Sequence, residues 1–332
     1  MTATSIILPR NWWLMAMAAG LAALLLVVRS PSATERPVTP LFPGFDGAEI
    51  TELRIETPMD EGAEPEVVTL VRESVDDPWK VQELYGAPGN ANRIGSVLNW
   101  VGTMTDLDVV SRGATPVTDY GLGEGEAVKV TLRRGHTSPG EGPGLDGDAL
   151  SLFASPGSGG GAFVRLAGEK RVARVPQFPL QARGPLSWFE RDSLVPLESI
   201  QIRKVVVTGS ALAEPLTVTL PDRVMTEFVD GSGTKIPTAV ALELFRSLRA
   251  TFPDDVIALP DEGLPAVLEW EITPAVGTPF RVVFTDLGES AATGAGRPGK
   301  GFRLGSDYGV VVNPLALSNV MKALEAVRNS VK

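Results

Sequence analysis

The hydrophobic pattern divides the chain into a short apolar segment and a long patterned body. Residues 12–28 are apolar and carry no charge. Beyond about residue 44, apolar and polar positions alternate in short runs such as 50–56, which is typical of strands with one buried face. Residues 90–104 and 237–249 instead place apolar side chains at helical spacing. The pattern predicts an N-terminal apolar helix followed by an α+β body.

The body shows the same order of elements twice, with a period of about 145–150 residues. Each half begins with strands, continues with one helix and returns to strands, and the last helix begins with Asn313 as N-cap and Pro314. The predicted strands lie at 50–56, 67–71, 79–82, near 109, 128–132, 150–153, 163–166 and 172–175, and then at 200–207, 216–220, 224–229, 256–259, 267–272, 280–285 and 310–312. We expect two repeated units, each a mostly antiparallel sheet with a helix packed on one face. The predicted domains are an anchor at 1–29, a Pro-rich tether at 30–43, a first unit at 44–190 and a second, diverged unit at 191–332.

The apolar run 12–28 predicts a single membrane span. Seventeen helical residues extend about 25 Å, near the lower limit for a bilayer core. A cleaved signal peptide is the alternative, but Arg29 and Pro31 crowd the small-residue site at 30–32. We therefore expect an uncleaved anchor with the body on the periplasmic or extracellular side of the cell membrane. The anchor residues are Trp12, Trp13, Leu14, Leu21, Leu24, Leu25, Leu26, Val27 and Val28.

Composition narrows the chemistry. The chain has no cysteine and one histidine, which excludes disulfides, thiol catalysis and Cys-based metal sites. Its formal net charge is −10, so nucleic acid is not an expected partner. No catalytic residue, cofactor or metal site is predicted. The oligomeric state stays open.

Several short motifs suggest sites but fit loops better. Residues 294–300 match G-x-x-x-x-G-K, yet Gly301 replaces the required Ser or Thr and no helix pattern follows. Gly159–Gly161, the Asp146 and Asp148 pair, and His136 also lie in Gly-rich stretches, at 135–161. All of these are interpreted as hairpin loops.

Two groups of aromatic and acidic side chains are more specific. Glu269 and Glu271 alternate with Trp270, so we expect the indole in the core and the carboxylates in water. Trp188 and Phe189 lie between the two units, where the pair either forms an interaction site or packs the units together. Packing is the preferred interpretation.

The order of several sequence strings resembles a known family. The strings are Leu41-Phe42-Pro43, Val68–Arg72 followed by Trp79-Lys80-Val81, the helix at 91–101, Val110-Ser111, Tyr120-Gly121-Leu122, Phe163-Val164-Arg165 and Ser187-Trp188-Phe189. In this order they resemble the domain of unknown function 4340 family over about 41–207. The resemblance implies a membrane-anchored bacterial protein, sometimes associated with gliding-type ABC transporter components, and no established catalytic residues.

We therefore expect a non-enzymatic accessory or scaffold protein in a membrane complex, with a protein partner and an ABC-type transporter as the implied setting. An envelope glycan- or peptide-binding module is the alternative. A carboxylate-dependent hydrolase is the third hypothesis, and it requires two facing carboxylates in a cleft.

Overall fold

A computed structural model gives the fold of most of the body. It describes residues 17, 38–59, 63–113, 115–123, 125–134, 149–157, 161–221, 227–259, 265–288, 298–303 and 306–331. All nine predicted anchor residues lie outside these ranges, which include only Met17 of the apolar run 12–28. Within them, no helix is both long and apolar enough to cross a membrane.

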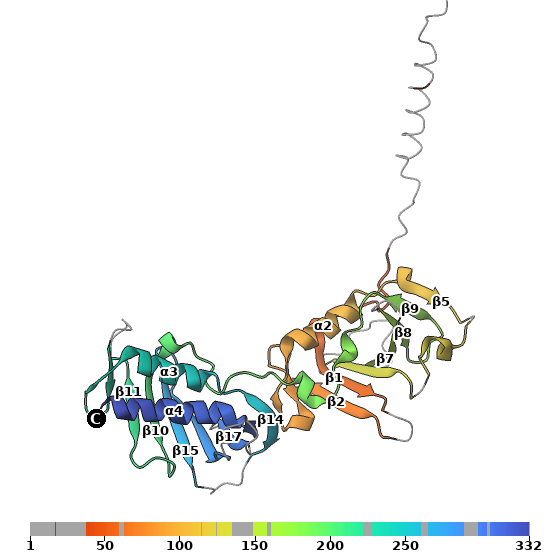
Figure 1. Cartoon of the computed structure of the whole chain (residues 1–332). Coiled ribbons are helices and arrows are strands. Elements are labelled where there is room, and N and C mark those ends of the chain that lie inside the picture. The colour runs from red at the N-terminus through yellow and green to blue at the C-terminus, as the bar shows by residue number, and fades with distance from the viewer. Residues whose placement is uncertain are drawn as a thin grey trace, which may run out of the picture.

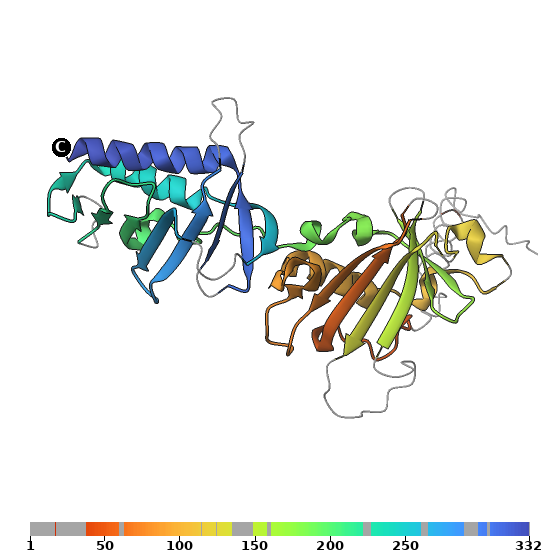
Figure 2. The ribbon, with the colours of Figure 1, turned by 90° about the horizontal axis from the view of Figure 1, so that it is seen from below.

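The described body consists of two antiparallel sheets of nine strands each, and the two units lie end to end (Figures 1 and 2). The first sheet contains β1 (Ile50–Thr57), β2 (Glu66–Val71), β3 (Lys80–Val81), β4 (Ala87–Pro88), β5 (Val109–Ser111), β6 (Val128–Arg134), β7 (Ala149–Pro156), β8 (Ala162–Leu166) and β9 (Val172–Val175). The second contains β10 (Ile202–Thr208), β11 (Leu216–Thr219), β12 (Phe228–Asp230), β13 (Lys235–Ile236), β14 (Pro253–Ala258), β15 (Leu268–Pro274), β16 (Phe280–Asp286), β17 (Gly299–Arg303) and β18 (Tyr308–Val312).

The strand order proves that the units repeat. The first sheet runs β4-β3-β2-β1-β6-β7-β8-β9-β5, and the second runs β13-β12-β11-β10-β15-β16-β17-β18-β14. Each strand of one sheet has its counterpart at the same place in the other. Even the irregularity matches, because β1 slips register against β6 after Ile50 and β10 slips against β15 after Ile202. The predicted repeat is therefore confirmed down to a shared bulge.

The helices predicted for the body are also confirmed. Helix α2 (Ala91–Gly102) begins after Asn90, whose side chain accepts a hydrogen bond from the Arg93 backbone N–H at 2.9 Å. Helix α3 (Thr238–Arg249) occupies the equivalent place in the second unit. Helix α4 (Pro314–Ser330) begins at the predicted cap, where Asn313 Oδ1 accepts from the Leu315 N–H at 2.9 Å. Such caps satisfy otherwise unpaired N–H groups of the first turn.

Three details differ from the expectation. The second unit carries two helices, α3 and α4, whereas the first has short 3₁₀ turns, η6 (Pro179–Gln181) and η7 (Pro185–Trp188), in place of a counterpart to α4. Strands β4 and β13 were not predicted, because two residues are too short to show a period. The predicted loop at 288–301 ends early, since Gly299 already belongs to β17.

Each unit has its own core, and the two cores meet at a junction. In each unit the apolar face of the sheet packs under its helices. Val256 of β14 is only 6% exposed because it packs into the core of the first unit. Across the same junction the rings of Phe189 and Tyr308 meet edge to face, with centroids 6.4 Å apart. The two sheets are thus joined by side chains as well as by the connecting chain.

Candidate functional site

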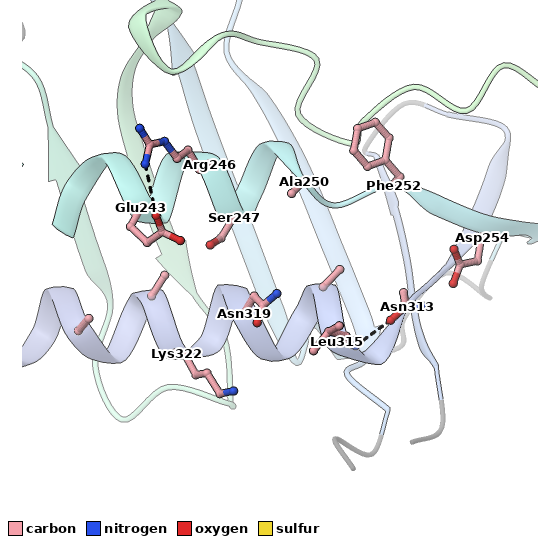
Figure 3. Close-up of a pocket in the computed structure, with 13 residues that line it drawn as sticks. Glu243, Arg246, Ser247, Ala250, Phe252, Asp254, Asn313, Leu315, Asn319 and Lys322 are labelled. Carbon is pink, nitrogen blue, oxygen red and sulfur yellow. Dashed lines mark hydrogen bonds and ion pairs between the residues drawn. The ribbon is translucent and has the colours of Figure 1, made fainter. Parts of the chain in front are cut away.

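A groove lies in the second unit, between α3 and α4 (Figure 3). Its volume is about 730 Å³. The two helices run side by side in opposite directions along one face of the sheet, and Ser247 of α3 and Asn319 of α4 project into the space between them. This groove has no counterpart between α2 and a second α-helix in the described part of the first unit, because only 3₁₀ turns follow β9 there.

Small side chains line much of the groove. Ser247 of α3 and Ala323 of α4 are buried, and Ala250, just after α3, and Ala316 and Ala326 of α4 add to the lining. Bulkier residues at these positions would fill the space between the helices. The floor is therefore shaped to admit an apolar surface.

Two exposed apolar side chains stand at one end of the groove. Phe252, in the segment between α3 and β14, is 47% exposed, and Leu315 in the first turn of α4 is 55% exposed. Large apolar side chains that remain exposed beside a groove are typical of binding surfaces. The hydrophobic pattern predicts neither residue as part of a site, because Leu315 lies off the buried stripe of α4 and Phe252 lies outside any periodic segment.

Charged side chains around the groove balance one another. Arg246 and Glu243 form an ion pair across one turn of α3, with 3.7 Å between Nη1 and Oε2. Lys322 and Asp254 add one charge of each sign. The local charge therefore selects no strongly acidic or basic partner, and recognition depends on the apolar contacts.

Two glycines of β17 lie where the strand packs closely against its neighbours: Gly299, in the G-x-x-x-x-G-K match that the sequence favours as a loop, and Gly301 just after it. A Cβ on Gly299 would collide with Leu317 of α4, and one on Gly301 would lie 2.7 Å from a ring carbon of Phe284. Lys300 lies between them on β17. The glycines therefore serve close packing of a strand, and the described end of this motif is not a phosphate loop.

The groups with shifted pKa lie away from the groove. Burial lowers the pKa of Arg72 and raises that of Tyr308, a hydrogen bond from the Ser232 hydroxyl lowers that of Asp230, and the hydrogen bond to Glu169 raises that of Arg171. Among the described residues, no group of three His, Asp or Glu side chains is placed to hold a metal ion. What the described residues around the groove offer is a surface of small and exposed apolar side chains with mixed charges at its rim.

Arg72 shows that a residue with a shifted pKa can have a structural role. Its guanidinium donates to the carbonyls of Ile50 at 2.7 Å and Val75 at 2.6 Å, and it lies 4.7 Å from the ring centre of Trp79. These contacts hold the loop after β2 against the start of β1. The pKa shift reflects structural burial.

The structure places the other predicted residues as follows. Trp188 is fully buried and Phe189 is 4% exposed, and the backbone around them pairs with the edge beside β4, where the Asn90 N–H donates to the Trp188 carbonyl at 2.7 Å. Trp270 is buried, and Glu269 and Glu271 point to the open face, where Arg281 pairs with both at 3.2 and 3.7 Å. This confirms the alternation predicted for β15. His136, Asp146, Asp148, Gly159, Gly160 and residues 294–297 lie outside the described residues.

A family model matches part of the chain. Residues 79–223 match the family described as Domain of unknown function (DUF4340). The predicted resemblance to DUF4340 is thereby confirmed for this part of the chain. The searches of curated proteins and of solved structures found no match.

The DUF4340 match does not coincide with one sheet. It begins beside β3 and ends just beyond β11, so it includes the later strands of the first sheet and the first two strands of the second. Because β10 and β11 are the counterparts of β1 and β2, the matched segment contains one complete set of the nine strands in shifted order. The α3–α4 groove lies beyond the DUF4340 match.

Proposed function

We propose that this protein is a non-enzymatic accessory or scaffold component of a membrane complex, anchored by residues 12–28 with its body exported. The α3–α4 groove is the observation that supports a binding role, because it combines an apolar floor with two exposed apolar side chains. The apolar N-terminal segment supports membrane anchoring. The resemblance to DUF4340 suggests an ABC-type transporter as the complex.

The groove suits an amphipathic helix from the partner. A third helix laid between α3 and α4 would bury its apolar face against the alanines and against Phe252 and Leu315. The balanced rim charges would pair with polar residues at the edges of that helix. Binding of this kind needs no chemistry in the groove.

In-cell crosslinking tests the proposal. Tagged full-length protein is compared with a form that lacks residues 1–30 and is exported by a cleavable signal, and recovered proteins are identified by mass spectrometry. Recovery of permease or ATPase subunits with the full-length form alone supports an anchored accessory role. If neither form recovers a protein although expression and crosslinking controls succeed, the scaffold proposal is wrong and glycan or peptide binding takes its place.

A substitution in the groove locates the interface. We expect Leu315→Glu to reduce recovery of the partner at least about tenfold, because it places a charge where an apolar side chain is buried on binding. The fold should tolerate this change, since Leu315 is exposed and an acidic residue in the first turn of a helix is favourable. Val276→Glu is the matched control, because Val276 is 90% exposed in the turn between β15 and β16, away from the groove. Equal recovery with both variants would place the interface elsewhere.

A further inference from the structure

Two polar side chains enter the α3–α4 groove from its two helices. Ser247 of α3 and Asn319 of α4 project into the space between the helices (Figure 3). Along α4, the apolar side chains of Leu315 and Ala323 line the groove on either side of Asn319. The two hydrogen-bonding groups therefore lie within a stretch of lining that is otherwise largely apolar.

Neither of these side chains has a hydrogen-bond partner within the part of the chain that the structure describes. Ser247 is only 8% exposed, and it is its backbone carbonyl, and not its hydroxyl, that bonds the Thr251 hydroxyl at 3.1 Å. Another buried hydroxyl, that of Ser155, donates to the Tyr120 carbonyl at 2.6 Å. Buried polar groups are normally paired, so an unpaired hydroxyl that faces a groove is available to a ligand.

These unpaired groups set a chemical condition on whatever covers the groove. A helix laid over Ser247 and Asn319 removes water from both, and an apolar side chain above them would leave them unpaired. A charged side chain would be buried without a counter-ion, because the charges at the rim balance one another. An Asn or Gln side chain offers a donor and an acceptor without net charge, whereas Ser and Thr in a helix bond readily to their own backbone. A carboxamide therefore satisfies both groups best.

We propose that the groove recognises an amphipathic partner helix that carries an Asn or Gln at the centre of its apolar face. This inference rests on the proposed binding function of the groove and names the feature that selects the partner. The partner's carboxamide bonds Ser247 and Asn319 within the apolar contact, and a single buried polar contact of this kind also fixes the register of a bound helix. The lining of α4 extends from Leu315 to Ala326, about 17 Å, so the matching face is about three turns long.

Selection from a helix library tests this specificity. Full-length protein is the bait, and the probes are displayed amphipathic helices of Leu, Ala, Glu and Lys in which the central position of the apolar face is randomised. We expect the wild-type chain to enrich Asn and Gln at that position about tenfold over Leu, because an apolar centre leaves Ser247 and Asn319 unpaired. Asn319→Leu should reverse this preference. Leu315→Glu identifies the helices that bind in the groove, since it should abolish their binding.

The outcomes of the selection separate this inference from the proposed function. Helices that depend on Leu315 but carry apolar centres would overturn the inference and leave the groove as a binding site. The same holds if the wild-type chain and Asn319→Leu select the same central residues. If neither chain selects a helix whose binding depends on Leu315, the groove does not bind helices, and both proposals are wrong.

In-cell crosslinking applies the same test to the natural partner. We expect Asn319→Leu to reduce recovery of the partner at least about tenfold, although it makes the groove more apolar, while Asn319→Gln retains most of the recovery. Asn329→Leu is the matched control, because Asn329 is an exposed residue of α4 outside the lining of the groove. Urea unfolding establishes that the three variants are equally stable. Equal or greater recovery with Asn319→Leu would show that apolar contacts alone select the partner.

A second copy of the chain is the competing occupant of the groove. The chain has no cysteine, so Ala326→Cys places a unique thiol in the groove, and Val276→Cys places one in the exposed turn between β15 and β16. We expect a short bismaleimide to link neither full-length variant to itself. Efficient linkage through position 326 with none through position 276 would place a second copy in the groove and overturn the proposed partner helix.

Discussion

At the scale of single residues, Tyr308 links the two units, and its contribution to the free energy of unfolding depends on pH. Burial raises its pKa; Arg303 opposes this shift and Asp192 adds to it. Its ring also meets Phe189 across the junction. The hydroxyl is therefore held neutral in the folded chain at pH values where an unfolded chain begins to ionise it.

We expect the stabilisation from the neutral Tyr308 hydroxyl to be lost at high pH. Because the folded pKa is the higher one, the unfolded chain loses its proton first, so the stabilisation is full below about pH 10 and disappears as the pH rises through the folded value. Tyr308→Phe keeps the ring and should flatten this part of the profile. Thermal unfolding of both forms between about pH 9 and pH 11 measures the difference, and identical profiles would mean that Tyr308 does not titrate differently on folding.

At the scale of elements, helix α4 shows how local sequence and tertiary packing combine. The sequence alone predicts where α4 begins, because Asn313 is a typical N-cap residue and Pro314 is favoured at the first helical position. The Leu317 side chain fills the space over Gly299, where a Cβ would collide with Leu317 Cδ1. The groove exists because α4 lies beside α3 on the same face of the sheet.

Removing the cap of α4 should lower the free energy of unfolding, and the matched control changes another asparagine that lines the same groove. We expect Asn313→Ala to lower the free energy of unfolding by about 1 kcal/mol, because the Leu315 N–H loses its acceptor. Asn319→Ala is the matched control, since Asn319 is exposed in the interior of the same helix and alanine favours helix there. Urea unfolding followed by tryptophan fluorescence compares the two, and an equal effect would refute the capping role.

At the scale of the whole molecule, the junction decides whether the two units act as one body. Val256 of the second unit packs into the first core, and the turn η2 (Gln82–Leu84) of the first unit contacts β14. The counterpart edge of the first unit is β5. The same place in the repeat thus forms a packed junction in the second unit, where β14 meets the core of the first.

A charge at Val256 should separate the units while leaving each sheet intact. We expect Val256→Asp to cost at least about 2 kcal/mol at the junction, because an unpaired carboxylate would be buried there. Hydrogen exchange should become faster in β14 and η2, and small-angle scattering should show a broader distribution of shapes. Val276→Asp, at a 90% exposed position, is the control. Unchanged exchange at the junction would show that these contacts do not hold the units together.

Much of the architecture follows from the sequence because its signals are local. Alternation along 50–56 and 267–272 predicts strands, the spacing in 90–104 and 237–249 predicts helices, and their order predicts a repeat. Strands β4 and β13 cannot be predicted in this way, because they are defined by their pairing partners and not by a pattern in their own residues. The sequence also located Trp188 and Phe189 between the units, but not the residues that they meet.

The sequence by itself determined the repeat, the caps, the buried faces and the apolar N-terminal segment, because each depends on residues close together in the chain. Only the tertiary structure decided the groove and the junction. Leu315 and Phe252 are 63 positions apart, and no local period relates them. Long-range strand pairing and helix packing bring such residues together, and these depend on the whole fold.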